Sequence, residues 1–409
     1  MSTALKRWLV MSFVSNAIFS YVGIFVNLFI WEKNHSISEV ALYNLFMFVS
    51  WSFGFSIATS VLAKTTVRLP LAISAFAGTA AFVMLSTLEL DSRLLWLGLI
   101  GAFVGIMYSF YNAAHHMSVT VSGKSAELGR YFSALGIIQQ TVMLAIPLLS
   151  AGIMYYFEYA GTFVLMFVLF LFMLAFTMAM PQFSLRGATQ AELDKPTIRW
   201  LAQELVRKPG LRWFSASSFA AGVFIQFQML FSLLFTFSVT ENKLWVALLS
   251  GLYTCSSFGG MFAYRRLRLK DSTFLTTGVV LIACGLLIVL IPSKPLLIVS
   301  NLLTALGMYC FLAAWNTVQF KWVKPYSEAK QSKLLVWRET LLCVTRMALL
   351  LVVATLDDLR GPLFYVLLAI SLLCLALVPF FEYRAKKLLD QGQSESAVSG
   401  SRLPINSKA

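Results

Sequence analysis

The chain has 409 residues, of which 59% are hydrophobic and only 12% are charged, and its net charge is +14. About a quarter of the residues of a soluble globular protein are charged, so this composition indicates a protein that crosses a membrane many times. The positive charge does not indicate nucleic-acid binding, because Lys and Arg lie between the apolar segments and not along one face. The five cysteines lie singly within apolar segments, so we expect neither a disulfide framework nor a metal site.

Apolar segments long enough to span a bilayer recur along the whole chain. A spanning helix needs about 20 predominantly apolar residues, and the sequence contains twelve such segments. The predicted helices cover approximately residues 8–30, 38–63, 69–88, 94–121, 131–156, 162–180, 212–239, 244–264, 272–291, 295–320, 335–356 and 362–382. The first is too long for the apolar part of a signal peptide, so we expect it to be retained. We therefore predict an all-α integral membrane protein with twelve transmembrane helices.

The basic residues predict the orientation of these helices. With the N-terminus in the cytoplasm, 26 of the 32 Lys and Arg residues fall in cytoplasmic segments and only five in external loops. Cytoplasmic loops carry an excess of Lys and Arg, so both termini are expected in the cytoplasm. Short loops and the lack of sorting signals indicate the inner membrane of a bacterial cell.

The longest connection divides the helices into two sets of six. We expect an N-terminal six-helix bundle at 1–180, a cytoplasmic central loop at 181–211, a C-terminal six-helix bundle at 212–383 and a disordered cytoplasmic tail at 384–409. The stretch VALYNLFMFVSWSFG (40–54) is similar to VALLSGLYTCSSFGG (246–260), and RW at 7–8 recurs at 212–213. One offset of 205–206 residues relates both pairs, which indicates an internal repeat.

Two similar six-helix bundles with a central cytoplasmic loop and both termini inside resemble the major facilitator superfamily of transporters. The motif G-x-x-x-D-R-x-G-R-[RK] follows the second helix of each half in that family. The segment GMFAYRRLRLK (260–270) keeps the first glycine and basic residues of the motif, but Tyr264 replaces the acid. The first half keeps Gly54 and has Ala58 in place of the acid. Residues 25–44 are also similar to uncharacterised Bacillus-type members.

The resemblance implies two pseudo-symmetric bundles that rock about a substrate site near the middle of the membrane. It also implies that helices 1, 2, 4, 5, 7, 8, 10 and 11 line the cavity between the bundles.

Arg346 is the most informative residue of these helices. It lies in LLCVTRMALLLVV (341–353), near the centre of the predicted eleventh helix, where a charge costs at least about 2.5–3.5 kcal/mol. The nearest acid, Glu339, is seven residues earlier, on the same helix face but about 10.5 Å away. We therefore expect Arg346 to line the cavity and bind an anionic group of the substrate. The alternative is a structural arginine bonded to the carbonyls of a broken helix.

Other polar residues of the cavity helices are candidate substrate contacts. The offset of 206 residues places Gln140 opposite Arg346 and Ser20 opposite Gln226. The fourth helix carries one polar stripe and the tenth carries another. The predicted substrate-binding set is Arg346, Gln140, Gln226, Ser20, Asn112, Asn316, Gln319, Trp315 and Tyr108. Hydrogen bonds between helices, worth about 0.6–2 kcal/mol each, are the alternative role for any one of them.

Proton coupling needs a group that titrates near working pH. His115 and His116 meet this requirement, because histidine has an ordinary pKa of about 6.5. Glu339 is a third candidate. The alternative for the histidine pair is a position near the cytoplasmic end, facing water.

These observations predict a secondary active transporter of a small organic solute, anionic or amphipathic, with proton coupling and export as the expected mode. A flippase for a lipid-linked precursor and a membrane receptor or assembly protein without transport are alternatives. The expected partners are the lipid bilayer, the solute and protons, with a monomeric protein and no nucleic acid or cofactor. We expect no enzyme: GKS at 123–125 lacks the earlier glycine of a phosphate-binding loop, and no Ser, His and Asp set falls in one compartment.

Overall fold

Long helices make up nearly all of the described chain. The structure is a computed structural model, and it describes residues 3–87, 92–122, 125–182, 203–240, 242–267, 270–291, 293–323, 326–356 and 361–400. These residues contain no β-strand, so the prediction of an all-α protein is confirmed.

The helices follow the predicted segments in order. The first half contains α1 (Thr3–Tyr21), the π-helical turn η1 (Val22–Val26), α2 (Asn27–Asn34), α3 (Ile37–Lys64), α4 (Arg68–Thr87), α5 (Arg93–Ser122) and α6 (Ser125–Ala179). The second half contains α9 (Pro209–Val239), α10 (Lys243–Leu267), α11 (Asp271–Ile288), α12 (Lys294–Val323), α13 (Glu328–Val353) and α14 (Pro362–Gly400). The run from α1 through η1 to α2 is the first predicted helix. A kink at Glu158 divides α6 into the fifth and sixth.

Ten of the described helices are long and apolar enough to cross a membrane. One of them, within α6, holds two predicted spans. The remaining predicted span is α13, which carries Arg338, Glu339 and Arg346. Each of the twelve predicted segments therefore corresponds to helix, and the chain is a multi-pass membrane protein.

The turn between α2 and α3 shows how few residues a connection needs. His35 ends α2 with φ 47° and ψ 33°, and Ser36 precedes α3 in an extended conformation. The Ser36 hydroxyl accepts a hydrogen bond from the backbone N–H of Glu39 at 3.3 Å. This Ser-x-x-Glu cap satisfies one of the free donors at the start of α3 and fixes the position of the turn.

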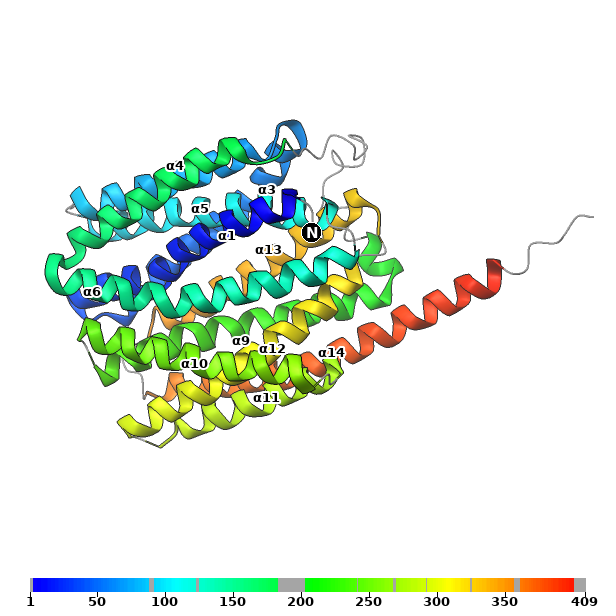
Figure 1. The fold of residues 1–409 in the computed structure, drawn as a ribbon. Helices are drawn as coiled ribbons and strands as arrows, with labels where there is room; N and C mark the ends of the chain where they lie inside the picture. Colours follow the sequence, from blue (N-terminus) through cyan, green and yellow to red (C-terminus); the bar gives the residue numbers. More distant parts are fainter. Residues whose placement is uncertain are drawn as a thin grey trace, which may run out of the picture.

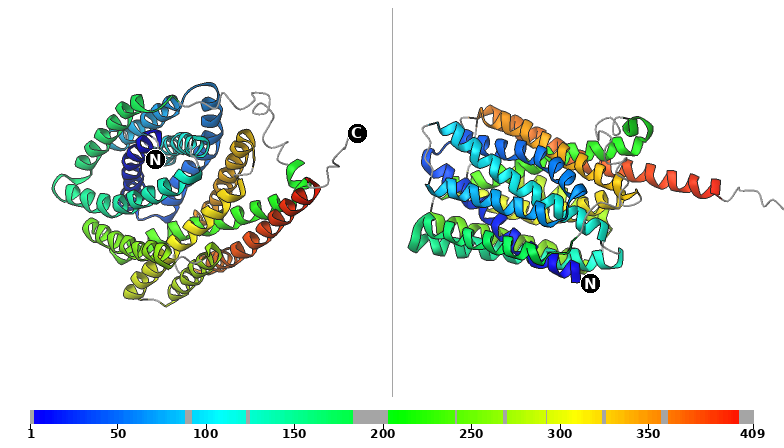
Figure 2. Two further views of the ribbon diagram at one scale, coloured as in Figure 1. Left: turned by 45° about the vertical axis from the view of Figure 1, so that its right-hand side comes forward. Right: turned by 90° about the horizontal axis from the view of Figure 1, so that it is seen from above.

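The two halves have the same order of helices and lie side by side along their length (Figure 1). α1 and α9 begin 206 residues apart, as do α3 and α10, which agrees with the offset in the sequence. Figure 2 shows the halves from other directions, with α13 beside the first half. Across the boundary α13 packs against α3, and α10 packs against α6.

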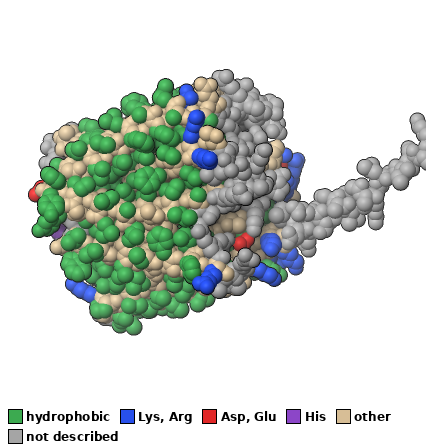
Figure 3. Space-filling view, in the orientation of Figure 1, with side chains coloured by type: hydrophobic (Ala, Val, Ile, Leu, Met, Phe, Trp, Pro, Cys, Tyr) green, Lys and Arg blue, Asp and Glu red, His purple; other side chains and the backbone are tan. Residues whose placement is uncertain are grey.

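Apolar side chains cover the lateral face of the bundle (Figure 3). Tyr156 is 78% exposed and Phe53 is 70% exposed, as expected of residues that face lipid. Lys and Arg gather along one rim of this face, at the end where the N-terminus and the projecting part of α14 lie. We call this the basic end. There Arg7 and Arg68 donate hydrogen bonds to the carbonyls of Ala179 and Met180 and cap the end of α6.

Glycines bring α3 and α5 close together. A Cβ atom at Gly105 would lie 2.3 Å from the Met47 carbonyl oxygen and 2.7 Å from Ser50 Cβ. At Gly101 it would lie 2.7 Å from the Tyr43 carbonyl oxygen. Small residues at such positions allow the close backbone contact that holds membrane helices together, because lipid supplies no hydrophobic force between them.

Two predicted boundaries differ from the structure. α13 begins at Glu328 and not at 335, because the polar turns before the apolar run are also helical. α14 continues to Gly400, so residues 384–400 of the tail predicted to be disordered are helical and extend beyond the bundle (Figure 1). Residues 183–202 of the predicted central loop and 401–409 of the tail lie outside the described residues.

Candidate functional site

Arg346 lies at the boundary between the two halves. It is half-buried, and its guanidinium carbon lies 5.0 Å from the ring centroid of Phe48 on α3 of the other half. The described residues give it no salt bridge, and its Nε atom is buried without a hydrogen-bond partner. It lies seven residues, roughly 10 Å, before the end of α13, which also contains the polar turns that precede the apolar segment. Its central position in the apolar segment stays a prediction. The side chain points to the interface, and no described carboxylate forms a salt bridge with it.

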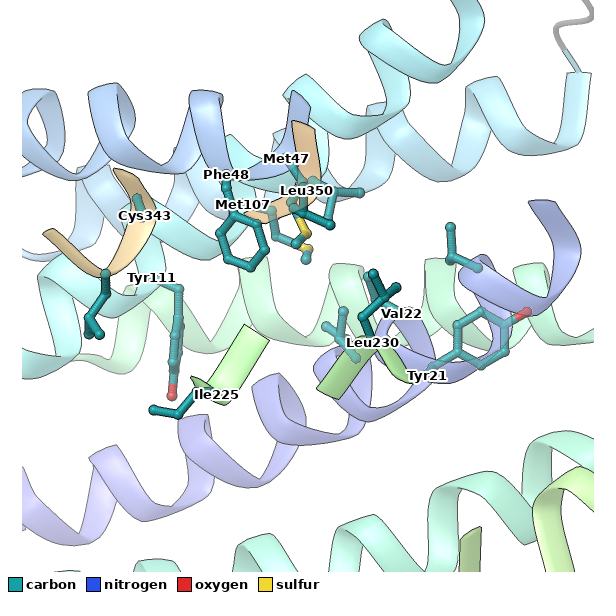
Figure 4. Packing of buried hydrophobic residues seen from close by; sticks show 14 of the residues in the cluster. Tyr21, Val22, Met47, Phe48, Met107, Tyr111, Ile225, Leu230, Cys343 and Leu350 are labelled. Atoms are coloured by element: carbon teal, nitrogen blue, oxygen red, sulfur yellow. The ribbon is translucent and has the colours of Figure 1, made fainter. Parts of the chain in front are cut away.

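Apolar side chains from both halves meet around Phe48, the residue that Arg346 contacts (Figure 4). Met47 and Phe48 come from α3, and Cys343 and Leu350 come from α13, all of them buried. This part of the interface therefore combines one unpaired cation with an apolar wall.

Two buried glutamine oxygens, one of them on the predicted site residue Gln140, lack hydrogen-bond partners in the described structure. The Oε1 atom of Gln140 on α6 is buried and unpartnered, as is that of Gln228 on α9. Gln226 is 3% exposed, and the structure gives neither it nor Ser20 a hydrogen bond to a described residue. No hydrogen bond brings these residues to Arg346, so their common site remains a prediction. Buried polar groups without partners are uncommon in proteins and indicate places for water or a ligand.

The polar stripe of the fourth predicted helix is bonded within the first half. The Tyr108 hydroxyl donates to the Phe19 carbonyl at 3.3 Å, and its ring stacks on Trp51 with centroids 5.0 Å apart. Asn112 donates to the carbonyl of Tyr108 at 2.8 Å. These contacts hold α1, α3 and α5 together, and the substrate-binding role of Tyr108 and Asn112 stays a prediction.

The two neighbouring histidines have different surroundings. His115 is 7% exposed, its Nε2 atom lies 2.7 Å from the Tyr131 hydroxyl, and its ring stacks on Tyr111. It therefore does not face water. His116 is half-buried, with an unpartnered Nδ1 atom and its ring centroid 6.4 Å from that of Phe320 on α12 of the other half. Only His116 of the pair reaches the boundary between the halves.

The polar stripe of the tenth predicted helix joins a charged cluster inside the second half. Arg338 donates to Glu339 at 2.9 Å and to the Asn316 side-chain oxygen at 2.5 Å. Its guanidinium carbon lies 4.6 Å from the Trp315 ring centroid, a cation–π contact. Glu339, a predicted proton-coupling residue, is therefore in a buried salt bridge.

Glu382 on α14 completes this cluster. Ser217 of α9 donates to its Oε1 atom at 2.5 Å, and Gln319 of α12 donates to the same atom at 2.6 Å. The Trp315 indole donates to the Ser217 hydroxyl at 3.0 Å. The bonds connect α9, α12 and α14, so Trp315 and Gln319 have partners within the protein.

Arg338 and Glu382 were missed in the sequence. Because the eleventh helix was predicted to begin at 335, Arg338 lay at its margin and counted as a cytoplasmic charge. In the structure it is ten residues, or about 15 Å, into α13. Glu382 stood at the predicted end of the last helix and was not considered as a site residue. A charge within or at the end of a predicted helix is the signal that would have identified each of them.

A separate groove of about 550 Å³ lies on the first half between α3, α4 and α5. Its walls are apolar and include Phe53 and Ile57, which are 70% and 55% exposed. Because these side chains face outward, the groove belongs to the lateral surface and not to the boundary between the halves.

No family model matches the chain, and no curated protein matches it. Solved structures do match. A bacterial homologue of the iron transporter ferroportin, in its outward-facing state with soaked iron, gives a TM-score of 0.66 at 14% identity, covering 94% of this chain and 100% of that one. The nucleoside transporter NupG, as a single-residue variant, gives a TM-score of 0.67 at 10% identity, covering 94% of this chain and 100% of that one.

A POT family transporter in complex with 5-aminolevulinic acid gives a TM-score of 0.66 at 11% identity, covering 93% of this chain and 96% of that one. The ferroportin homologue also matches in its inward-facing state, with a TM-score of 0.63. Identities this low compare the folds alone. They agree with the two six-helix halves described above, so the chain has the same fold as these transporters.

Proposed function

We propose that this protein is a secondary transporter that moves small amphipathic organic anions between its two halves by alternating access. The observation that carries the proposal is Arg346, a cation at the boundary of the halves without a carboxylate partner among the described residues. A guanidinium at such depth is unfavourable unless something compensates its charge. An anionic group of a solute would do so.

The surroundings of Arg346 favour a solute with an apolar body. Phe48, which the guanidinium contacts, lies among the buried apolar side chains of Met47, Cys343 and Leu350 (Figure 4). A carboxylate, sulfonate or phosphate would bind the N–H groups of Arg346, and an attached aromatic or aliphatic group would contact these side chains. The unpartnered amide of Gln140 would supply a hydrogen bond at the same boundary.

Alternating access is supported by the way the halves meet. Each half is held together internally by hydrogen bonds such as that of Ser217 with Glu382. Across the boundary the described contacts are mainly apolar or aromatic, with one long hydrogen bond of 3.5 Å from Thr254 to the Met143 carbonyl. An aromatic example is Trp31 against Phe237, with ring centroids 6.0 Å apart. Two internally bonded bodies with weak contacts between them suit rocking about a central site. Proton coupling is part of the proposal; export remains a prediction from the aromatic-rich cavity helices.

The test is transport in proteoliposomes after a thermal-shift screen of organic anions, since a ligand stabilises the state that it binds. Arg346→Ala is expected to lose at least about tenfold in flux, and Arg346→Lys a similar amount because Lys cannot form the paired hydrogen bonds of a guanidinium. Arg93→Ala is the matched control, because Arg93 forms a salt bridge with Glu39 near the opposite end. Flux through Arg346→Ala equal to wild type would overturn the proposal.

A further inference from the structure

Glu382 is a buried carboxylate whose hydrogen-bond donors are neutral. Its side chain is 5% exposed, and the bonds from Ser217 and Gln319 both end on Oε1. Oε2 is therefore the oxygen left to carry a proton. An ionised carboxylate is unfavourable in such a place unless a cation is in direct contact with it, and protonation removes that penalty.

The second buried acid of the cluster differs in this respect. Glu339 is in direct contact with the guanidinium of Arg338 at 2.9 Å, a charge-assisted hydrogen bond. Arg338 uses its other terminal nitrogen on Asn316. Glu382 thus experiences Arg338 only at longer range. Of the two acids, Glu382 is the one placed to gain and lose a proton.

The groups facing Glu382 come from three helices. They are Ser217 on α9, Trp315 and Gln319 on α12, and Arg338 on α13; Arg338 is the only charged one among the described residues. α11 also packs against α14, and the described structure records no charged side chain of α11 against Glu382. Arg384 on α14 itself is exposed and lies over the ring of Phe380.

His115 and His116 are less suited than Glu382 to gaining and losing a proton. His115 is sealed between aromatic rings and bonded to Tyr131. A protonated His116 would face the guanidinium of Arg338, which has the same sign of charge.

We propose that Glu382 is the proton-binding site of this transporter and that it takes up a proton, as an O–H bond at Oε2, when an organic anion binds at Arg346. The inference rests on the proposed function. Among the four described charges Arg338, Glu339, Arg346 and Glu382, the first two neutralise each other, so Arg346 and an ionised Glu382 balance in the empty protein. When an anion binds at Arg346, these four residues and the anion together carry one net negative charge. A proton on Glu382 restores neutrality. Arg338 lies within electrostatic range of both groups and connects them.

This coupling has a consequence for direction. Each ligand raises the affinity for the other by the same factor, because linkage is reciprocal. Anion and proton therefore move together, as symport. An inward proton gradient would drive uptake of the anion, the opposite of the export expected from the aromatic composition.

The direct test is infrared difference spectroscopy of the full chain in detergent between about pH 5 and 8, where an ordinary Glu is ionised. Wild type is expected to show the carbonyl stretch of a protonated carboxylic acid that disappears as pH rises. Glu382→Gln should lack this band. Glu39→Gln, which changes an acid paired with Arg93 elsewhere, should keep it. Absence of a band that depends on Glu382 would overturn the inference, whatever the substrate.

The coupling is measured with benzenesulfonate, a strong acid that does not cross lipid in a neutral form. In wild-type proteoliposomes an inward gradient of one pH unit should concentrate it up to about tenfold, as expected for one proton per anion. Glu382→Gln should lose this accumulation, whereas the control Glu39→Gln should keep it. Benzenesulfonate flux that needs Arg346 but ignores pH would refute the proton site and leave the proposed function intact. Loss of all flux in Arg346→Ala but not in Glu382→Gln would support the proposed function.

If Glu382→Gln does not fold, proton uptake on anion binding can still be measured without that variant. Adding benzenesulfonate to weakly buffered wild-type protein should remove about one proton per bound anion from solution, and Arg346→Ala should remove none. Anion binding without proton uptake would contradict the inference.

Discussion

Replacing Gly105 by alanine tests how closely α3 and α5 pack. The new Cβ would lie 2.3 Å from the Met47 carbonyl oxygen, 2.7 Å from Ser50 Cβ and 3.0 Å from the Trp51 backbone nitrogen. Two of these atoms are backbone, so no rotamer change relieves the contact. Carbon atoms pack at about 3.5–4.0 Å, so the helices must separate by roughly 1 Å.

The expected free-energy change combines opposing effects. Overpacking costs about 1–3 kcal/mol. Separation also weakens the hydrogen bond from Ser50 to the Ala102 carbonyl, 2.8 Å long, which is worth roughly 0.6 kcal/mol in a membrane. Alanine gains about 1 kcal/mol over glycine within a helix. The net expectation is a loss of about 0.6–2.6 kcal/mol in the free energy of unfolding.

Gly98→Ala on the same helix is the matched control. A Cβ there would meet the Phe46 ring at 3.7 Å, an ordinary contact, so stability should be unchanged or rise by up to about 1 kcal/mol. Reversible unfolding in mixed micelles, followed by circular dichroism, gives both values. Equal stability of the two variants would show that α3 and α5 are not in backbone contact at Gly105.

Two further predictions concern backbone strain and the buried ion pair. Glu158, exposed at the kink in α6, has φ 53° and ψ −152°, a region open to glycine, so Glu158→Gly should stabilise the protein by about 1–3 kcal/mol, whereas Glu158→Ala should not. Thermal unfolding distinguishes the two, and a destabilised Gly variant would contradict the argument. Arg338→Met should cost about 3–5 kcal/mol because it leaves Glu339 buried without its cation. Adding Glu339→Gln should recover most of this loss; a double variant no better than the single one would show that the pair is not the cause.

Hydrophobicity was sufficient to predict the helices because lipid demands runs of about 20 apolar residues. It was insufficient where a helix extends beyond the bilayer. The first turns of α13, EAKQSK, form helix without being apolar, so the predicted start was seven residues late and Arg338 was misplaced. α14 passes through Glu382 and continues into polar sequence in the same way.

Partnerships between distant residues were also beyond the sequence. Gln319 and Glu382 are 63 residues apart, and Ser217 and Glu382 are 165 apart. A polar stripe identified Gln319 and Trp315 as buried polar residues, but not whether they face a cavity or another helix. Arg346 was easier to recognise, because a cation in an apolar segment stands out whatever surrounds it.

The contact of Arg346 with Phe48 is one of the contacts that hold the two halves together. A cation above an aromatic ring contributes about 0.5–2 kcal/mol, well below the 3–5 kcal/mol lost when a buried ion pair is broken. Thermal energy can break such a contact often, and breaking it leaves no carboxylate of the opposite half buried without its cation. At this contact the two halves can therefore separate even when the protein is empty. A solute would need to shift the equilibrium between the closed and opened forms only slightly.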